Sequence, residues 1–337
     1  MPRERQFTGF DAFKQAIDSG VDWVILATSP HFRPQQFEYA VRQGKHVFME
    51  KPLAVDAPGI RQVLAAAEEA KKKGLKVGTG FQRRHQKTYQ ETVEKIHTGI
   101  LGSIKLLRVF WNGGFLWAIP RRPEMTEMEF QVRNWNYFTW LSGDHIVEQH
   151  VHNLDIAYWV LGKTPVEAQG MGGRQVRTDP LYGHIFDHHA VEFTYDDGVK
   201  LISQCRQMQG TWSHVAEHVL GTAGTSQVDR GVVETATERW RSRGQGGNPY
   251  QVSHDVLVDA ILNNKPHMEA EDSAYATMMG IMGRMATYSG QVVRWDDAIG
   301  SPLKLAPQSY ALDADPPILP DATGHYPVAM PGVTKAW

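Results

Sequence analysis

Short apolar runs alternate with amphipathic segments over the first third of the chain. Three runs predict buried strands, at 21–28, 46–49 and 76–81. Three further segments carry apolar residues on one face and predict helices, each ended by a glycine, at 33–44, 56–74 and 89–99. Strands and helices that alternate in this way are typical of an α/β fold with a doubly wound parallel sheet.

Beyond Gly102 the pattern changes to longer, aromatic-rich strands in which apolar and polar residues alternate, at 104–113, 166–176, 188–207 and 214–222. They predict a second, α+β domain with a large, mostly antiparallel sheet that has one open face. Three helices accompany it, at about 145–161, 253–263 and 273–289, and the proline-rich segment that follows should be extended. We therefore expect three parts, at 1–102, 103–300 and 301–337.

The composition narrows the possible partners. The 337 residues include 35 Lys and Arg and 37 Asp and Glu, a net charge of -2, so nucleic acid is not an expected partner. The single cysteine, Cys205, excludes an internal disulfide framework. No apolar run reaches the roughly 18 residues of a membrane span, and the N-terminus has no signal-peptide pattern. A cytoplasmic location is the default expectation, unless an export signal precedes Met1.

Polar side chains follow all three predicted strands. Glu50, Lys51 and Pro52 leave the strand at 46–49, and the stretches ATSPHFR and GFQRRH leave its two neighbours. Since open α/β sheets bind ligands outside the carboxyl ends of their strands, these exits predict a ligand site. Taken alone, Glu50 and Lys51 fit a surface ion pair equally well. The candidate cofactor-binding residues are Ser29, Pro30, Glu50, Lys51, Gln82 and Arg83.

The stretch GKHVFMEKPLA resembles the Glu-Lys-Pro motif of the Gfo/Idh/MocA family, two-domain NAD(P)-dependent oxidoreductases that act on sugars and cyclitols. The resemblance implies NAD or NADP as cofactor and a carbohydrate or cyclitol as substrate. It places Lys51 beside the nicotinamide and the reacting hydroxyl, and Glu50 near the nicotinamide ribose. In this family the open face of the second sheet forms the substrate cleft or an oligomer contact.

The segment SGDHIVEQHVHNLDIAYWVLG places His145, Glu148, His152 and Asp155 within about a quarter turn of one helix. This stripe fits an internal hydrogen-bonded face, a metal site or a catalytic site. The resemblance favours the catalytic interpretation, with Glu148 at the family's aspartate position and His152 at its catalytic histidine. His150 stands where the family usually has glycine. We therefore expect His152 as general base or acid, oriented by Glu148, and no metal ion.

Several other side chains are candidates for contact with a substrate. Trp135 and Tyr137 offer ring faces for a sugar, although core packing is an alternative role for such residues. The remaining candidates are His145, Asp155 and Arg206. The stretch YGHIFDHHAVEF adds further polar groups that paired strands could bring to the open sheet face, at His184, Asp187, His188 and His189.

The Gly-x-Gly-x-x-Gly turn that normally opens a dinucleotide-binding fold does not occur in the chain. The stretch GMGGRQ at 170–175 opens no predicted helix, so we reject it as a phosphate loop. By the resemblance, the first two strand-helix units of the Rossmann-type sheet are absent, which leaves it incomplete. The start was assigned too far downstream, or the protein is a reduced version. On either view, weak NAD binding is expected.

The leading functional hypothesis is an oxidoreductase that interconverts a hydroxyl and a ketone on a sugar or cyclitol. One alternative is a redox-neutral glycosidase that uses NAD transiently, and another is a non-catalytic binding or assembly protein. The apolar stretch FWNGGFLW at 110–117 predicts a homo-oligomer formed through the open sheet.

Overall fold

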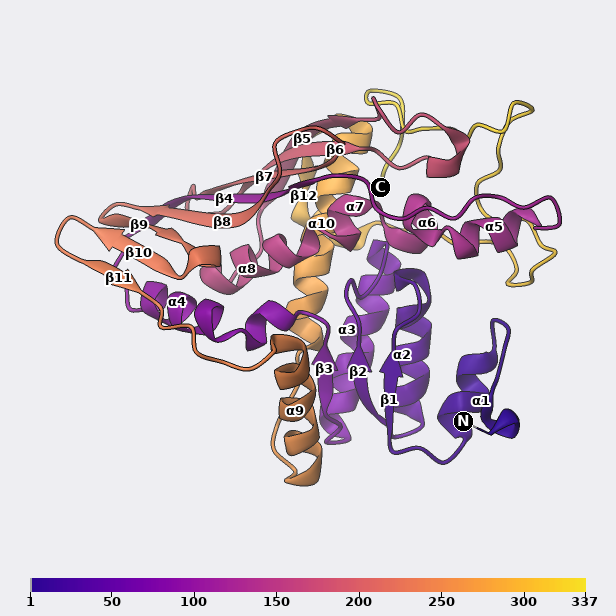
Figure 1. Cartoon of the computed structure of the whole chain (residues 1–337), viewed down its shortest axis with the longest axis horizontal. Helices are drawn as coiled ribbons and strands as arrows, with labels where there is room; N and C mark the ends of the chain where they lie inside the picture. Colours follow the sequence, from indigo (N-terminus) through magenta and orange to yellow (C-terminus); the bar gives the residue numbers. More distant parts are fainter. Residues whose placement is uncertain (1) are drawn as a thin grey trace.

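A three-stranded parallel sheet forms the lower part of the molecule in Figure 1, a computed structural model that describes residues 2–337. Its strands follow the order β1 (Trp23–Leu26), β2 (His46–Met49) and β3 (Val77–Thr79). The connecting helices are α2 (Arg33–Arg42) and α3 (Ala57–Lys72). The parallel pairing that the sequence predicts is confirmed, because each crossover helix returns the chain to the same end of the sheet.

Helix α9 (Pro249–Leu262), from much later in the sequence, covers the sheet face opposite α2 and α3 (Figure 1). The His254 ring packs against Phe48 of β2 at a tilt of 34°, with ring centroids 4.1 Å apart. The helix begins before the expected residue 253 because the Asn248 side chain caps it and accepts a hydrogen bond from the Tyr250 N–H. Helix α4 (Lys87–His97) packs against the second sheet and α8. The chain then continues into the second sheet, so the first sheet gains no further strand from it.

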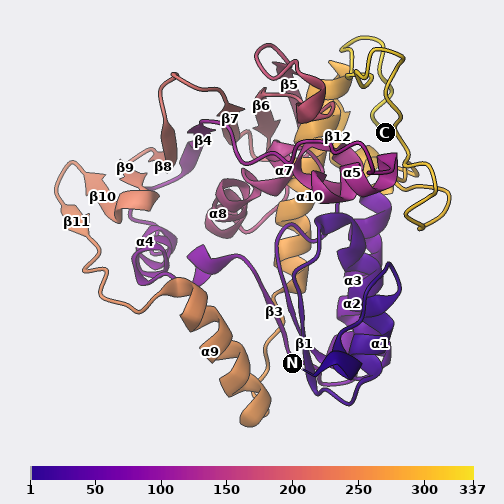
Figure 2. The same ribbon diagram turned by 45° about the vertical axis from the view of Figure 1, so that its right-hand side comes forward.

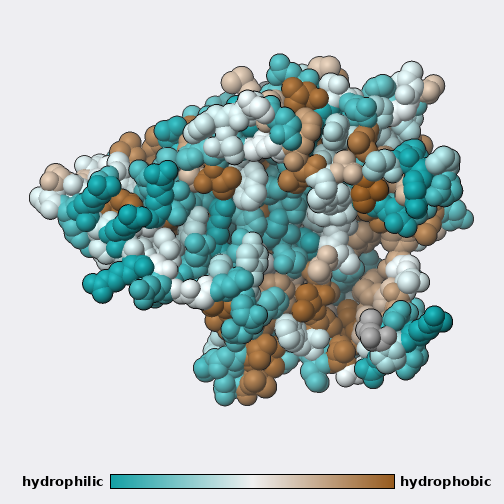
Figure 3. Space-filling model, viewed as in Figure 1, coloured by the Kyte–Doolittle hydropathy of each residue, from teal (hydrophilic) through white to brown (hydrophobic). Residues whose placement is uncertain are grey.

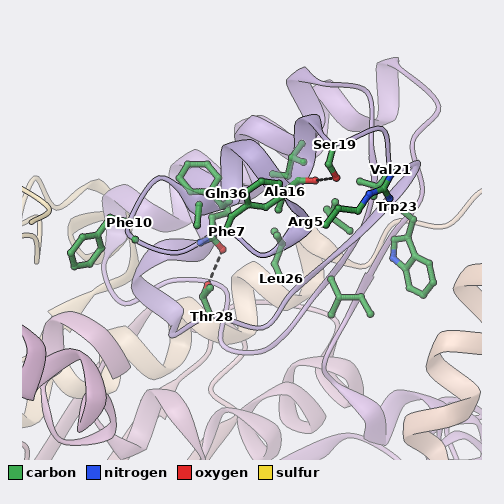
Figure 4. A pocket seen from close by; sticks show the side chains of 16 residues that line it. Arg5, Phe7, Phe10, Ala16, Ser19, Val21, Trp23, Leu26, Thr28 and Gln36 are labelled. Atoms are coloured by element: carbon green, nitrogen blue, oxygen red, sulfur yellow. Dashed lines mark hydrogen bonds between the residues drawn. The ribbon is translucent and has the colours of Figure 1, made fainter. Parts of the chain in front are cut away.

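The outer edge of β1 pairs with no other strand among residues 2–337. Ile25 on this strand is 55% exposed. A short helix, α1 (Ala12–Asp18), lies nearby and leaves a cavity of about 520 Å³ against Leu26 and Gln36 (Figure 4). Hydrophobic surface is visible in the same lower part of the molecule in Figure 3. The first sheet therefore ends in an apolar, unpaired edge.

Nine strands form the second sheet, in the order β11-β10-β9-β8-β4-β7-β6-β5-β12. The expected strands are β4 (Ile104–Gly113), β5 (Glu167–Gly173), β6 (His188–Thr194), β7 (Lys200–Gln207) and β8 (His214–Gly221). The sequence pattern did not predict four further short strands: β9 (Gly224–Gln227), β10 (Val232–Thr235), β11 (Arg239–Arg241) and β12 (Val293–Arg294). Only β4 and β7 run parallel, so the mostly antiparallel sheet is confirmed.

Helix α10 (Ala270–Ser289) joins the two sheets by packing against α3 at one end and β5 at the other (Figure 2). A Cβ on Gly170 of β5 would lie 2.6 Å from the Ala190 carbonyl oxygen and 3.1 Å from the Thr287 methyl group of α10. The glycines of GMGGRQ therefore permit close packing around β5. This packing role agrees with the rejection of GMGGRQ as a phosphate loop. No helix among residues 2–337 combines the length and apolar character needed to cross a membrane.

The prediction of a single helix at 145–161 is wrong, because the structure has two helices there, α7 (His145–Glu148) and α8 (Val151–Leu161). At the break, the His150 N–H donates to the His145 carbonyl oxygen five residues back, at 3.1 Å. Such a widened turn changes the direction in which the preceding side chains point. Helices α5 (Glu127–Arg133) and α6 (Thr139–Ser142) precede it.

The segment after α11 (Trp295–Gly300) contains no helix or strand, in agreement with its proline-rich sequence. It follows the surface at the right of Figure 1, in yellow. Tyr326 packs with Phe138 and Trp140 in a second apolar cluster. The Tyr310 hydroxyl lies 2.7 Å from His31 Nε2, just after β1. The tail therefore contacts both parts of the molecule.

Four of the buried histidines in the second part of the chain have lowered pKa values, at His145, His150, His152 and His184. Burial disfavours their charged form and lowers the pKa of His145 to about 4 and that of His184 to about 3. It also holds the pKa values of the other two well below the ordinary value. Glu217 shows the opposite effect, since burial raises its pKa to about 7.

We expect the free energy of unfolding to decrease as the pH falls from about 6.5 to about 5, where the unfolded chain protonates these histidines. Each proton that only the unfolded chain binds lowers the free energy of unfolding by about 1.4 kcal/mol per pH unit. Glu217 offsets about one such proton, because its raised pKa lets the folded chain bind a proton at a higher pH than the unfolded chain does. Urea unfolding of His184→Gln should depend less on pH by about one proton. The same substitution at the exposed His325 is the matched control. A free energy independent of pH in this range would contradict the expectation.

Candidate active site

The exits of the three parallel strands meet at one edge of the sheet. Glu50 and Lys51 follow β2, between Thr28 after β1 and Gly80 after β3. A Cβ on Gly80 would overlap the Glu50 carboxylate, so glycine permits this close approach. The Lys51 N–H donates to Glu50 Oε2 at 3.2 Å. This bond holds the Glu50 carboxylate at the sheet edge, against Gly80.

Lys51 forms an ion pair with Glu148, which lies 97 residues later in the sequence. The Nζ atom lies 2.7 Å from Glu148 Oε1 and 2.5 Å from the Glu148 carbonyl oxygen. The two side chains are only 14% and 11% exposed. Lys51 is therefore held by α7 of the other domain and is not a freely solvated surface lysine.

His152 lies beside this pair on α8 and is 8% exposed. Its ring stacks on Trp111 of β4 with ring centroids 5.8 Å apart and an interplanar angle of 20°. Burial lowers the pKa of His152 well below its usual value, and the positive charges of Lys51 and Arg83 add to this effect. The imidazole is therefore neutral near pH 7 and can accept a proton.

Glu148, His152 and Asp155 thus face residues at the strand exits, as the helical stripe predicts. Asp155 accepts hydrogen bonds from Arg84 through both oxygens, at 2.8 to 3.0 Å. His145 does not share this face, because its Nδ1 lies 2.8 Å from Asp144 Oδ1 on the other side of the helix break. The geometry therefore gives no support to a metal site built from His145, Glu148 and His152.

Two of the expected cofactor-binding residues, Gln82 and Arg83, make contacts within the protein. Gln82 Nε2 donates to the Tyr250 hydroxyl of α9 at 3.2 Å. Arg83 forms a close ion pair with the buried Glu217 of β8, and its guanidinium lies 5.6 Å from the centre of the Trp111 ring. Arg83 therefore supports the His152 side of the site. Ser29 is half-buried at the exit of β1, beside the buried Pro30.

Three of the five expected substrate contacts are fully buried and bonded internally: Tyr137, His145 and Asp155. The Tyr137 hydroxyl donates to the Leu116 carbonyl oxygen at 3.1 Å. Since none of these side chains reaches solvent, we leave them out of the proposed site. Trp135 is half-buried against Trp117, with ring centroids 5.9 Å apart.

Arg206 lies on the outer face of the second sheet, where it donates to the Trp212 carbonyl oxygen at 2.8 Å. Its neighbours on β7, Cys205 and Gln207, point inward. The expectation that His184, Asp187 and His189 lie on the open sheet face is wrong, because all three are buried. Among the four polar residues of that stretch, only His188 keeps an exposed side chain, at 38%.

Residues important to the geometry were missed by the sequence analysis. The sequence places Trp111 in the apolar stretch predicted to form an oligomer contact, but strand alternation turns it toward His152. Arg33 ends the predicted strand exit ATSPHFR and begins the predicted helix, but no separate role is predicted for it. It is buried and donates to the Pro52 and Thr28 carbonyl oxygens, each at 2.5 Å, so it joins the exits of β1 and β2. Burial lowers its pKa to about 10, although Glu148 and Glu50 oppose this.

The residues at the strand exits fit the nicotinamide end of a dinucleotide, because Lys51 and Glu50 supply a cation and an acceptor at the carboxyl edge of a parallel sheet. The pyrophosphate end is different. The α3 N-terminus is capped by its own Asp56, which accepts from the Gly59 N–H at 2.8 Å. Over residues 2–337 no glycine-rich turn opens a helix at this edge, so we assign no residue to the pyrophosphate.

The fold is shared with solved structures of sugar and cyclitol oxidoreductases. The aldose-aldose oxidoreductase from Caulobacter crescentus superposes with a TM-score of 0.68 at 20% identity, over 87% of this chain and 85% of that chain. The scyllo-inositol dehydrogenase from Lactobacillus casei, solved with bound NAD(H) and scyllo-inositol, gives a TM-score of 0.64 at 21% identity, over 86% and 84%.

Sequence comparisons agree with the fold. The myo-inositol 2-dehydrogenase of Thermotoga maritima is 23% identical over 297 residues, 84% of this chain and 82% of that protein. The 1,5-anhydro-D-fructose reductase of Ensifer adhaerens is 28% identical over 292 residues, 81% of this chain and 80% of that protein.

Two family models match consecutive parts of the chain. The oxidoreductase family model described as an NAD-binding Rossmann fold matches residues 3–81, and the GFO/IDH/MocA C-terminal domain matches residues 89–227. The first match contains Lys51 and the second contains Glu148 and His152, so the ion pair joins the two family domains. The chain belongs to the Gfo/Idh/MocA family of oxidoreductases.

Proposed function

We propose that this protein transfers hydride between NAD or NADP and a secondary hydroxyl of a cyclitol or sugar. The observation that carries the proposal is the pairing of Lys51 with Glu148 beside a neutral His152, at the carboxyl edge of the parallel sheet. The names of the relatives support the substrate class, since they include an inositol dehydrogenase and an anhydrofructose reductase.

When bound, the nicotinamide supplies the hydride acceptor or donor. Oxidation of an alcohol also requires that the hydroxyl proton leave as the carbonyl forms. The neutral His152 ring can take this proton, and the Lys51 ammonium can donate a hydrogen bond to the same oxygen as negative charge develops on it. Glu148 holds Lys51 in position, and Trp111 holds the plane of the His152 ring. Trp135 remains the candidate for contact with the sugar ring.

A redox-neutral reaction is the second candidate. A relative from Escherichia coli is named 2,7-anhydro-N-acetylneuraminate hydratase and is 25% identical over 228 residues, 67% of this chain and 57% of that protein. Net NADH formation from a free cyclitol or sugar supports the dehydrogenase. Product without net NADH, formed from a glycoside or anhydro-sugar, supports the alternative.

Both Lys51 and His152 should be required for turnover. Lys51→Ala and His152→Ala should each lower kcat at least about 100-fold, the usual effect of removing a positioned proton-transfer group. Lys105→Ala, at an exposed position on β4, is the matched control and should keep normal kcat. Initial rates at saturating cofactor provide the measurement. If either variant keeps near-normal kcat, that residue has no part in the mechanism.

We expect weak cofactor binding, because the residues assigned to the site contact only the nicotinamide end. Titration with NADH, followed by its fluorescence, should not saturate below about 1 mM, the upper end of ordinary enzyme KM values. Glu50→Ala should weaken the signal further, while the distant Glu238→Ala should not. Micromolar affinity would show that other residues hold the pyrophosphate.

We also propose a homo-oligomer formed through the outer face of the second sheet. On this face Met171 is 79% exposed and pairs with Ala190, whereas Phe110, in the same row of paired residues, is buried. An exposed apolar side chain such as Met171 favours self-association when a second copy covers it. Light scattering at tens of micromolar should give a mass above that of one 37.9 kDa chain, and Met171→Glu should lower it. A monomer mass for the unaltered chain would contradict the proposal.

A further inference from the structure

A buried group of one carboxylate and two imidazoles lies behind the candidate active site. Asp144 precedes α7, His145 begins it, and His189 lies on β6. One possible ligand atom from each residue lies within 4.8 Å of the other two, and all three side chains are shielded from solvent. None of them takes part in the proposed hydride transfer.

The hydrogen bonds around His189 determine which of its ring nitrogens is protonated. Its Nδ1 lies 2.9 Å from the Thr287 hydroxyl oxygen. That hydroxyl has one proton, which it donates to the carbonyl oxygens of Gly283 and Arg284, both at 3.1 Å. While it donates to either carbonyl, it accepts from His189. Nδ1 carries the proton of the neutral ring, and Nε2 presents a lone pair.

This lone pair faces a carboxylate oxygen, because His189 Nε2 lies 3.3 Å from Asp144 Oδ1. Two acceptors at this distance repel each other unless a positive charge lies between them, either a proton on Nε2 or a metal ion. The separation exceeds the roughly 2.7 to 2.9 Å of a charge-assisted N–H···O bond. It matches the distance of about 3.4 Å between two ligands of a tetrahedral ion with bonds near 2.1 Å.

Asp144 and His145 have neighbours of the kind that orient metal ligands by hydrogen bonds. Asp144 Oδ2 accepts from the Phe186 N–H at 3.0 Å and from the Tyr288 hydroxyl at 2.5 Å, which orients the carboxylate. His145 Nδ1 lies 2.8 Å from the same Oδ1 that faces His189. Its Nε2 is buried and has no hydrogen-bond partner in the part of the chain that the structure describes.

We propose that Asp144, His145 and His189 bind a divalent transition-metal ion of the zinc class at a structural site. Two imidazoles and one carboxylate supply three of the four ligands of tetrahedral zinc, which leaves the fourth position to a water molecule. The ion joins the start of α7 to β6 and, through Thr287, to α10. Because α7 carries Glu148, the ion stabilises the position of the Lys51 partner without touching the substrate.

Metal analysis of the tag-free full-length chain, purified without chelators, tests the proposal. We expect about one zinc ion per chain. His189→Ala should lower the affinity for zinc at least about tenfold, because the loss of a ligand costs no less than the loss of an outer-shell partner, and the purified variant should hold less than one ion per chain. The matched control is His188→Ala, which removes the adjacent, partly exposed histidine and should leave the metal content unchanged. Full metal content in folded His189→Ala would overturn the proposal.

A second measurement applies if His189→Ala does not fold. The unaltered chain is stripped with a chelator and then titrated with Co(II), which should produce the visible absorption of tetrahedral cobalt bound to imidazole. Added Zn(II) should remove this absorption and raise the Tm of the stripped chain. A folded chain that is free of metal as purified and takes up neither ion overturns the proposal.

Discussion

The ion pair between Lys51 and Glu148 is the interaction on which the geometry of the site depends. It is the point at which the exit of a parallel strand meets a helix of the other domain. Since both side chains are largely buried, loss of either partner leaves a charge that water compensates poorly, at a cost of about 3 to 5 kcal/mol. The pair therefore positions Lys51 and also disfavours separation of the two domains at this edge.

Neighbouring contacts make this pairing possible. Arg33 joins the loops after β1 and β2, so that the segment carrying Lys51 cannot move independently of the sheet. Arg284 of α10 donates to the Val55 and Gly143 carbonyl oxygens, at 2.8 and 3.0 Å. These bonds connect the segment after Lys51 with the segment before α7. Both ends of the Lys51–Glu148 pair are thus held by buried guanidinium groups.

A polar layer lies between this pair and the second sheet. Ser203 bonds to His150, and Thr139 bonds to His184, both at 2.7 Å. Since unpaired buried polar groups are costly, such a layer is stable only in one arrangement, which restricts α7 and α8 to one position. This explains why a segment so rich in histidine and acid lies inside the protein. The stripe suggested a site accessible to substrate, but most of its polar atoms are bonded to the interior.

The sequence by itself determined the elements whose signals are local. The strand at 46–49, the helices that end at glycine and the polar strand exits follow from the periodicity and chemistry of neighbouring residues, and the structure contains them. Contacts between distant segments were decided only by the tertiary structure. Trp111 reaches His152, and Arg83 reaches Glu217, through strand pairings that no local pattern encodes. The break before α8 is likewise absent from the local pattern, which predicts one helix, and His145 lies beside Asp144 and His189. Local patterns report which face a residue occupies within its own element, whereas partners depend on how the elements pack, because side chains reach only a few ångströms.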